Sequence, residues 1–531
     1  MSSEQVVVFD TTLRDGEQAA GTRLGLREKL EIAQQLARLG VDVIEAGFPI
    51  SSPQDFEAVK AIANHVQGPT ICGLSRAVQQ DIDMAGQALA GAKNRRIHTG
   101  LGISDIHIMS KFRDEKYGKT LEEKKARAFE MGIAAVKCAR KYTDDVEFYC
   151  EDSGRADKEY LFRIVEAVID AGATTVNIPD TTGYSIPEQF GVLISELIAR
   201  VPNSRKAIFS VHCHDDLGMA VANSLAGVKA GARQIEGTIN GIGERAGNAS
   251  IEEMVMAIRT RKDFFSVDTG INAKEFYRTS RMVAEMLGMP VPANKAVVGA
   301  NAFAHSSGIH VDGVIKNPLT YEIMRPEDVG SPDSAVILTA RTGRAGLKHR
   351  LRELGYSLSK EELDQVYQKF LGVADKKKEV FDDDLAVLIG AEIRAVDYTY
   401  ELLYLHVACG TGTIPTASVR MKAKGQSEPV TTAACGDGPI DAAYEAIRIA
   451  TGRSPKLENF ALKAITGGKE ALGEATVKIL DEHNRRFTGR GVSTDIIEAS
   501  AKAYVDAINR MVGSAADERP VESKLEIADL D

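Results

Sequence analysis

The sequence has few cysteines, and they lie far apart. Six cysteines are spread from Cys72 to Cys435 over a chain of 531 residues, and no two of them form a C-x-x-C pair. Structural zinc sites and disulfide frameworks both need cysteines at short, repeated spacings. The sequence therefore indicates neither, and we interpret the cysteines as reduced thiols, most of them buried.

Long apolar runs and an excess of basic residues are absent as well. No stretch reaches the roughly 18 consecutive apolar residues that a membrane-spanning helix requires, and residues 1–5 lack the charged and then apolar pattern of a signal peptide. The formal net charge of -10 at pH 7 disfavours binding to nucleic acid or to an anionic membrane. We expect a cytoplasmic protein with neither a membrane nor a nucleic acid as partner.

What is present is the composition of an ordinary globular protein. Hydrophobic residues make up 44% of the chain and charged residues 26%, and both values are close to the usual ones. A chain of 531 residues exceeds one typical domain. We therefore expect two or three domains.

Eight short runs rich in β-branched residues alternate with helical segments in the first half of the chain. Helical patterns such as residues 26–39 and 160–171 separate the runs. Eight β-then-α units in a segment of this length favour a (β/α)8 TIM barrel over an open doubly wound sheet. We expect a catalytic barrel over residues 1–274. The runs are residues 6–11, 41–47, 70–74, 96–101, 145–150, 175–178, 207–212 and 234–239.

Two other patterns follow the predicted barrel. Residues 275–390 are helical and loop-rich, and we interpret them as linker subdomains. Residues 391–513 contain two strand-strand-helix (ββα) units, which predict a separate α+β domain. Residues 514–531 are small, acidic and polar, and are predicted to be disordered.

Each ββα unit has a glycine-rich segment before its helix, residues 436–441 (GDGPID) and 489–495 (GRGVSTD). Turns of this kind leave backbone N–H groups and the helix start free for a small anionic or zwitterionic ligand. Gly436 and Gly438 are therefore candidate effector-binding residues. The alternative is that these glycines only permit tight turns, and the pattern does not separate the two.

Residues 210–218 (SVHCHDDLG) carry the clearest chemical signal. His212 and His214 stand at positions i and i+2 of a predicted strand, so both imidazoles face one side and can reach one metal ion. A buried histidine is more often a core residue than a ligand, but a purely structural strand rarely ends in such a polar segment. Strand alternation points Cys213 to the other side, so we do not expect it to be a ligand.

Further ligands follow other predicted strands. Asp15 offers a carboxylate after the first run, and Asn248 offers an amide oxygen, directly or through water, after the eighth. With His212 and His214 they predict an open divalent-metal site, with Mg or Mn in use and Zn as the alternative. A TIM barrel keeps its active site at the carboxyl ends of its strands, where these residues fall.

A metal ion in an open site can act as a Lewis acid on a bound 2-oxo acid, whose carboxylate and ketone oxygens can chelate the ion. Arg14, next to a predicted ligand, is placed to stabilise negative charge on an oxygen. Glu151, His310 and Tyr321 are candidates for proton transfer, although a surface or loop role is the commoner explanation for each alone. The pattern favours carbon–carbon bond formation or cleavage.

In combination these motifs resemble those of the 2-isopropylmalate, homocitrate and citramalate synthases, which condense acetyl-CoA with a 2-oxo acid. The resemblance covers nearly the whole chain. It rests on residues 13–18 (LRDGEQ), 212–218 (HCHDDLG), 240–248 (NGIGERAGN), 307–310 (SGIH), 436–439 (GDGP) and 489–491 (GRG).

The resemblance implies roles for individual residues. Metal binding would fall to the four residues already named, and Arg14 and Glu151 would act on the reacting groups. His310 and Tyr321 would reach in from the middle region, usually that of the partner subunit, so that a homodimer forms the active site. Acetyl-CoA is the implied co-substrate, with a monovalent cation such as K⁺ as a further cofactor. The implied substrate-binding residues are Leu74, His98, Tyr149 and Thr181.

The resemblance leaves two acceptors open. His98 favours the branched acid 3-methyl-2-oxobutanoate with leucine as inhibitor, which is our preferred interpretation. Tyr149 favours pyruvate with isoleucine as inhibitor, because synthases that use the branched acid often have a small residue there. The ββα pair over residues 391–513 resembles the regulatory domain that binds the end product of the pathway in this family. Homocitrate synthases generally lack this domain, as do barrel lyases of the hydroxymethylglutaryl-CoA lyase kind. A non-catalytic ligand-sensing homologue is disfavoured because no metal or catalytic position is missing.

Overall fold

The computed structural model divides into two compact units, Met1–Ile337 and Leu338–Asp531, which are described separately. It describes residues 4–305, 307–332, 338–339, 341–354, 358–375, 380, 384–385, 388, 399–464, 473–483 and 485–515. The predicted boundary at residues 390 and 391 and most of the predicted tail lie outside these residues. The proposed domain limits therefore remain predictions.

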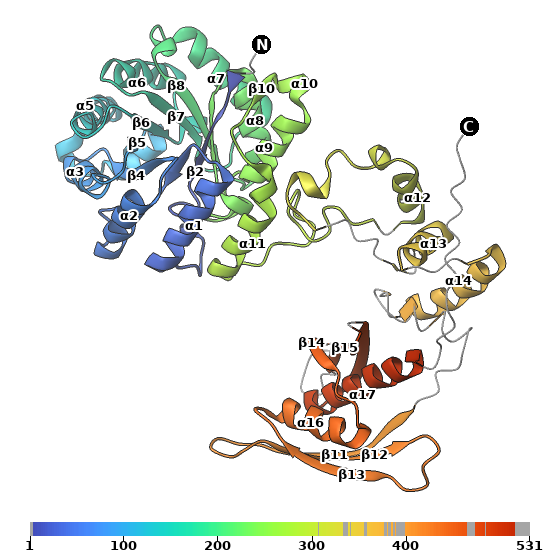
Figure 1. The fold of residues 1–531 in the computed structure, drawn as a ribbon. Coiled ribbons are helices and arrows are strands. Elements are labelled where there is room, and N and C mark those ends of the chain that lie inside the picture. Colours follow the sequence, from blue (N-terminus) through green and yellow to red (C-terminus); the bar gives the residue numbers. More distant parts are fainter. Residues whose placement is uncertain are drawn as a thin grey trace. The chain divides into compact units, whose positions relative to one another are not determined.

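The first unit contains a closed barrel of eight parallel strands, which confirms the predicted fold class (Figure 1). The first strand of the barrel pairs with both the second and the last, which closes the sheet. The strands are β2 (Val7–Asp10), β3 (Val43–Glu45), β4 (Thr70–Arg76), β5 (Arg95–Gly102), β6 (Val146–Glu151), β7 (Thr175–Asp180), β8 (Ile208–Cys213) and β9 (Gln234–Gly237).

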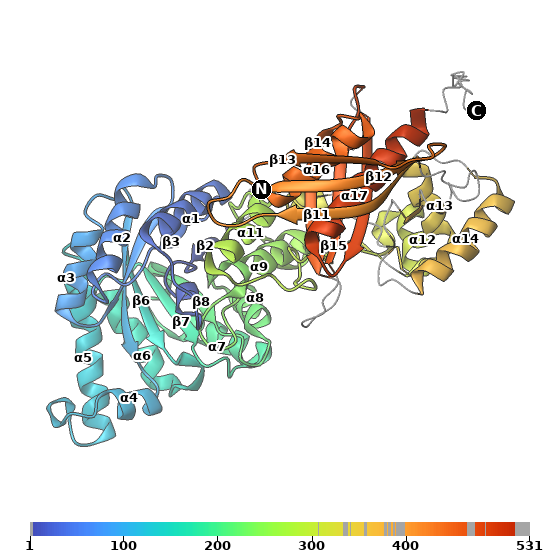
Figure 2. The ribbon, with the colours of Figure 1, turned by 90° about the horizontal axis from the view of Figure 1, so that it is seen from below.

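Amphipathic helices surround the strands of the barrel (Figures 1 and 2). Helix α1 shows the pattern: Ile32, Leu36 and Leu39 share its buried face. The helix ends at Gly40, whose φ of 85° is the left-handed conformation common at helix ends. The barrel helices are α1 (Leu26–Leu39), α2 (Pro53–His65), α3 (Gln79–Ala88), α4 (Asp105–Lys111), α5 (Leu121–Ala139), α6 (Lys158–Asp170), α7 (Pro187–Arg200), α8 (Ala220–Ala230) and α9 (Ile251–Thr260).

The first unit also contains short elements before and after the barrel strands in the sequence. Strand β1 (Glu4–Gln5) pairs in parallel with β10 (Val267–Asp268). The remaining helices are α10 (Lys262–Phe265), α11 (Phe276–Leu287) and α12 (Gly308–Lys316). Among the described helices, none combines the length and apolar character needed to cross a membrane.

The second unit contains the repeated architecture that the sequence predicts, with one more strand in each repeat. Helix α16 packs against β12 and β13, and α17 packs against β15 and β16. The unit's elements are α13 (Arg344–Glu353), α14 (Lys360–Ala374), β11 (Tyr400–Ala408), β12 (Thr416–Ala423), β13 (Val430–Cys435), α16 (Pro439–Thr451), β14 (Lys456–Ala464), β15 (Gly473–Leu480), β16 (Arg486–Ser493) and α17 (Ile496–Ala515).

One part of the sequence interpretation of this unit was wrong. Gly489 and Gly491 lie within strand β16, not in a turn before the helix. A Cβ atom on Gly489 would lie 2.1 Å from the carbonyl oxygen of Ala503, and one on Gly491 would lie 2.1 Å from that of Ala499. These glycines therefore allow helix α17 to pack directly on the strand backbone.

Candidate active site

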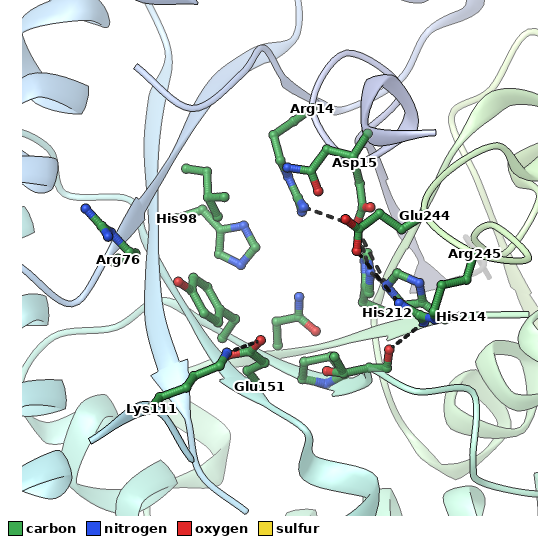
Figure 3. A pocket seen from close by; sticks show the side chains of 16 residues that line it. Arg14, Asp15, Arg76, His98, Lys111, Glu151, His212, His214, Glu244 and Arg245 are labelled. Atoms are coloured by element: carbon green, nitrogen blue, oxygen red, sulfur yellow. Dashed lines mark hydrogen bonds and ion pairs between the residues drawn. The ribbon is translucent and has the colours of Figure 1, made fainter. Parts of the chain in front are cut away.

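A polar cavity of about 290 Å³ lies where the barrel strands end. This is the face of a TIM barrel on which active sites are built. Figure 3 shows Asp15, His212 and His214 on one side of the cavity and the pair of Lys111 and Glu151 on another. The lining residues are Arg14, Asp15, Gln18, Leu74, Arg76, His98, Lys111, Tyr149, Glu151, Asn177, Pro179, Thr181, His212, His214, Glu244 and Arg245.

Asp15, His212 and His214 form a compact, buried cluster. Asp15 Oδ2 lies 3.3 Å from His212 Nε2 and 3.8 Å from His214 Nε2. The two Nε2 atoms are 3.0 Å apart. One ligand atom from each residue lies within 4.8 Å of the other two, a spacing suited to a shared metal ion.

Asn248 extends this cluster. It pairs with His214 across an isolated β-bridge, and its side-chain nitrogen donates to the carbonyl of Ile242 at 3.0 Å. That bond fixes the amide orientation, yet the buried Oδ1 atom has no hydrogen-bond partner in the described chain. Gly243 makes room for the amide, because a Cβ atom there would lie 2.2 Å from Asn248 Nδ2. An unpartnered oxygen beside two imidazoles and a carboxylate fits a divalent cation.

The electrostatics of the cluster favour a positive charge between the rings. Burial opposes protonation of His212, but contacts with Asp15 and Glu236 outweigh it and raise the pKa of His212 to about 9. Burial and the nearby charge of His212 lower the pKa of His214 to about 3. Burial also works against ionised Asp15, but Arg14 and His212 hold the pKa of that carboxyl well below its usual range. A cation at this position would take the place of that positive charge.

Glu45, inside the barrel on β3, fixes two residues of the cavity at once. Its Oε2 accepts from Arg14 Nε at 2.6 Å and from the hydroxyl of Thr11 at 2.6 Å. Its Oε1 lies 2.8 Å from His98 Nδ1, which leaves His98 Nε2 without a partner in the described chain. Arg14 also pairs with Asp15 at 3.1 Å. The guanidinium is therefore held at the boundary between the metal cluster and the open cavity.

Glu151 lies at the end of β6 and is paired with a cation. Lys111 Nζ, at the end of α4, donates to both carboxylate oxygens at 2.6 and 2.5 Å. Burial would raise the pKa of Glu151, but the contacts with His107 and Lys111 outweigh it and lower the pKa to about 2. Glu151 is therefore an ionised carboxylate at neutral pH.

Tyr149 and His98 form one wall of the cavity. Their rings meet edge to face with centroids 5.0 Å apart, and the Tyr149 hydroxyl donates to the carbonyl of Ser75 at 3.3 Å. Gly100 pairs with Tyr149 across the neighbouring strands. A Cβ atom on Gly100 would lie 2.6 Å from Cγ of the Tyr149 ring. Glycine at position 100 is what allows the tyrosine ring to occupy this wall.

The remaining predicted residues divide into two groups. Leu74 and Thr181 line the cavity, and Thr181 accepts a hydrogen bond from the backbone N–H of Asp152 at 2.9 Å. His310 and Tyr321 are not among the cavity-lining residues of the described chain, and their rings contact each other at a tilt of 39° with centroids 4.4 Å apart. Their proposed role at the active site therefore remains a prediction.

Several cavity residues were not predicted. Arg76 lies two residues after Leu74 and Asn177 four before Thr181, so strand alternation from the predicted residues would have found both. Gln18 and Arg245 lie inside motifs already recognised. Glu45 had no such signal, because it is one acidic residue within an apolar strand.

Comparisons with known proteins agree with this geometry. Residues 5–283 match the family model described as HMGL-like, residues 297–378 the homocitrate synthase post-HMGL domain-like model, and residues 379–512 the LeuA allosteric (dimerisation) domain. The 2-isopropylmalate synthase of Heliobacterium modesticaldum is 54% identical over 96% of this chain and 97% of its own length.

Two further relatives carry the same name. The 2-isopropylmalate synthase of Carboxydothermus hydrogenoformans is 53% identical over 96% of this chain and 98% of its own length. That of Pelotomaculum thermopropionicum is 52% identical over 96% of this chain and 99% of its own length. With an HMGL-like barrel, a LeuA-type carboxy-terminal domain and relatives matched over nearly their full length, the chain belongs to the 2-isopropylmalate synthase family of condensing acyltransferases.

Proposed function

We propose that this chain condenses acetyl-CoA with 3-methyl-2-oxobutanoate and hydrolyses the thioester, which gives 2-isopropylmalate and CoA at the entry to leucine synthesis. The observation that carries the proposal is the gathering of Asp15, His212 and His214 beside Arg14 and Glu151 in one cavity. Full-length similarity to 2-isopropylmalate synthases supports it.

The proposed metal site comprises Asp15, His212 and His214, with Asn248 as a direct or water-bridged ligand. A divalent ion bound there would supply Lewis-acid polarisation of the ketone of the 2-oxo acid. Mixed oxygen and imidazole ligands suit Mg or Mn, with Zn as the alternative. K⁺ as an additional cofactor is part of the same proposal.

The other residues of the cavity bind the acceptor and move charge. The Arg14 guanidinium, fixed by Glu45, stabilises the negative charge that develops on an oxygen during the addition. The Glu151 carboxylate accepts a proton from the methyl group of acetyl-CoA. His98, Tyr149, Leu74 and Thr181 form the walls that position the 2-oxo acid.

The proposed role of Glu151 predicts a pH effect. Lys111→Met removes one of the two groups that lower the Glu151 pKa and leaves His107, so the effect of burial is less fully offset and this pKa should rise. In the pH profile, kcat/KM falls at low pH as the base becomes protonated. This fall should occur at higher pH in the variant. Profiles of CoA release against pH measure the shift, and Lys111→Arg is the control that keeps the pair. An acid limb unchanged in Lys111→Met would contradict Glu151 as the base.

The complete function is tested by CoA release with a panel of 2-oxo acids, each assayed alone, with leucine and with isoleucine. We expect 3-methyl-2-oxobutanoate to give the highest kcat/KM and leucine to inhibit. The second candidate is citramalate synthesis from pyruvate with isoleucine as inhibitor. The bulk of Tyr149 in the acceptor wall favours it, and a preference for pyruvate in this assay would establish it.

A homodimer with an amino acid effector completes the proposal. The match of residues 379–512 to a LeuA allosteric (dimerisation) domain supports both parts. In the proposed dimer, His310 and Tyr321 of one subunit reach the cavity of the other. Gly436 and Gly438 precede helix α16, at the proposed effector site.

Gly438 gives a test of the effector site that spares the fold. A Cβ atom on Gly438 would meet no atom within 4 Å, and its φ of -152° suits any residue. Gly438→Val should therefore leave kcat in the absence of leucine unchanged and weaken leucine inhibition at least 5-fold. A 5-fold change corresponds to the lower end of typical allosteric coupling, about 1–3 kcal/mol. Leucine titrations of CoA release measure this, with Gly513→Ala as control. Unchanged inhibition would remove Gly438 from the effector site.

A further inference from the structure

Glu236 lies directly behind the metal cluster, in strand β9. Its side chain is fully buried, and Oε2 lies 3.3 Å from Nδ1 of His212. The contact is an ion-pair distance, and neither atom makes a conventional hydrogen bond, to the other or elsewhere, in the described chain. His212 is thus bounded on both sides of its ring, by Asp15 and His214 at Nε2 and by Glu236 at Nδ1.

This arrangement determines which nitrogen of His212 is available to a ligand. The Nε2 atom faces the Asp15 carboxylate and the other imidazole. A neutral imidazole that gives Nε2 to a cation carries its proton on Nδ1, and the group that accepts this proton fixes the tautomer and the ring plane. Glu236 is the acceptor in position to do so.

Glu236 is itself held in place by neighbouring strands. Its Oε1 accepts from the hydroxyl of Ser210 at 2.7 Å, and Ser210 in turn accepts from Gln234 at 2.9 Å. Gln234 also donates to Glu147 at 2.8 Å, and Glu147 pairs with Arg96 at 2.9 Å. This network leaves Oε2 directed at His212.

The charges single out His212 as the partner of Glu236. Arg96 pairs with Glu147, and Arg14 pairs with Glu45 and Asp15. Among the ion pairs of the described residues, Glu236 is joined to no lysine or arginine and pairs with His212 at 3.3 Å, while a ring nitrogen of His98 lies within 4.8 Å of its carboxylate. His214 lacks an equivalent, since its buried Nδ1 has no hydrogen-bond partner in the described chain.

We propose that Glu236 is a positioning residue for metal binding: it accepts the Nδ1 proton of His212, orients the ring and strengthens Nε2 as a ligand. The inference rests on the proposed metal site. It assigns a role in metal affinity to a side chain that does not line the cavity. His214 has no carboxylate in the corresponding position.

Direct metal binding tests the proposal. Electron paramagnetic resonance of free Mn²⁺ titrated into the full chain gives the Kd without an activity assay. Glu236→Gln, which keeps the side-chain volume and removes the charge, should raise the Kd about 10- to 100-fold, the usual effect of losing such a partner. Glu147→Gln is the control for the loss of a buried acid from the same network: Glu147 lies next to Glu236 but does not contact a proposed ligand. Its Kd should stay close to that of the wild type.

A second measurement separates positioning from a structural role. Activity lost by Glu236→Gln at limiting Mn²⁺ should return at saturating Mn²⁺, with a melting temperature close to that of Glu147→Gln. If Glu236→Gln does not fold, Ser210→Ala removes the hydroxyl that holds Oε1 and should weaken Mn²⁺ binding in the same direction. A wild-type chain that binds no Mn²⁺ would overturn the metal site and this inference together. A wild-type Kd in Glu236→Gln would overturn this inference alone.

Discussion

His212→Ala is expected to lose at least about 100-fold of the condensation activity while the barrel stays folded. Loss of a residue that only hydrogen-bonds to a metal ligand already lowers metal affinity or activity about 10- to 100-fold. Loss of a ligand removes a direct bond to the metal as well. His212 lies in the centre of the proposed metal cluster, within 3.3 Å of Asp15 Oδ2 and 3.0 Å of His214 Nε2. We expect the fold not to depend on the ion, because the proposed site would keep open positions, as catalytic metal sites do.

The control for this variant is Cys213→Ala. Cys213 is the next residue on the same strand and is also buried, but strand alternation places it on the opposite face. CoA release is measured after chelation and again after Mn²⁺ is restored, with circular dichroism to check the fold. Wild-type activity of His212→Ala after exhaustive chelation would refute the metal site.

The barrel and much of its cavity could be predicted from the sequence because two simple signals coincide. Strand-like runs recur at the spacing of β-then-α units, and polar motifs follow the runs. The barrel geometry then brings those motifs together, since parallel strands end at one face. Arg14 and His214, separated by 200 residues, line the same cavity for this reason.

Residues inside the strands were harder to predict. Glu45 and Glu236 are single acids in short strands, and only the closed barrel reveals that they face the cavity residues Arg14, His98 and His212. Strand β13 was missed because its sequence, VTTAAC, has no large apolar side chain after the first position. Strand β16 was read as a turn because its glycines serve the close packing of α17.

Tyr149 is the side chain that we propose limits the room for the acceptor. The ring is fixed from three sides: by the edge-to-face contact with His98, by the hydrogen bond to Ser75 and by the space that Gly100 leaves. We therefore expect the ring to keep its position when an acceptor binds, so that the acceptor must fit the remaining space. Replacing the ring should therefore change selectivity more than it changes catalysis.

Tyr149→Ser is expected to raise the ratio of kcat/KM for 3-methyl-2-oxobutanoate to that for pyruvate by about 10- to 200-fold, since one or two methylenes in an apolar pocket contribute about 1 to 3 kcal/mol. Tyr149→Phe is the control: it keeps the ring and loses only the bond to Ser75, so the ratio should stay close to that of the wild type. Equal ratios in the serine variant and the wild type would show that Tyr149 does not limit the acceptor. A wild-type preference for pyruvate that serine reverses would replace the branched acid with pyruvate as substrate, because the ring would then be the group that excludes the larger acid.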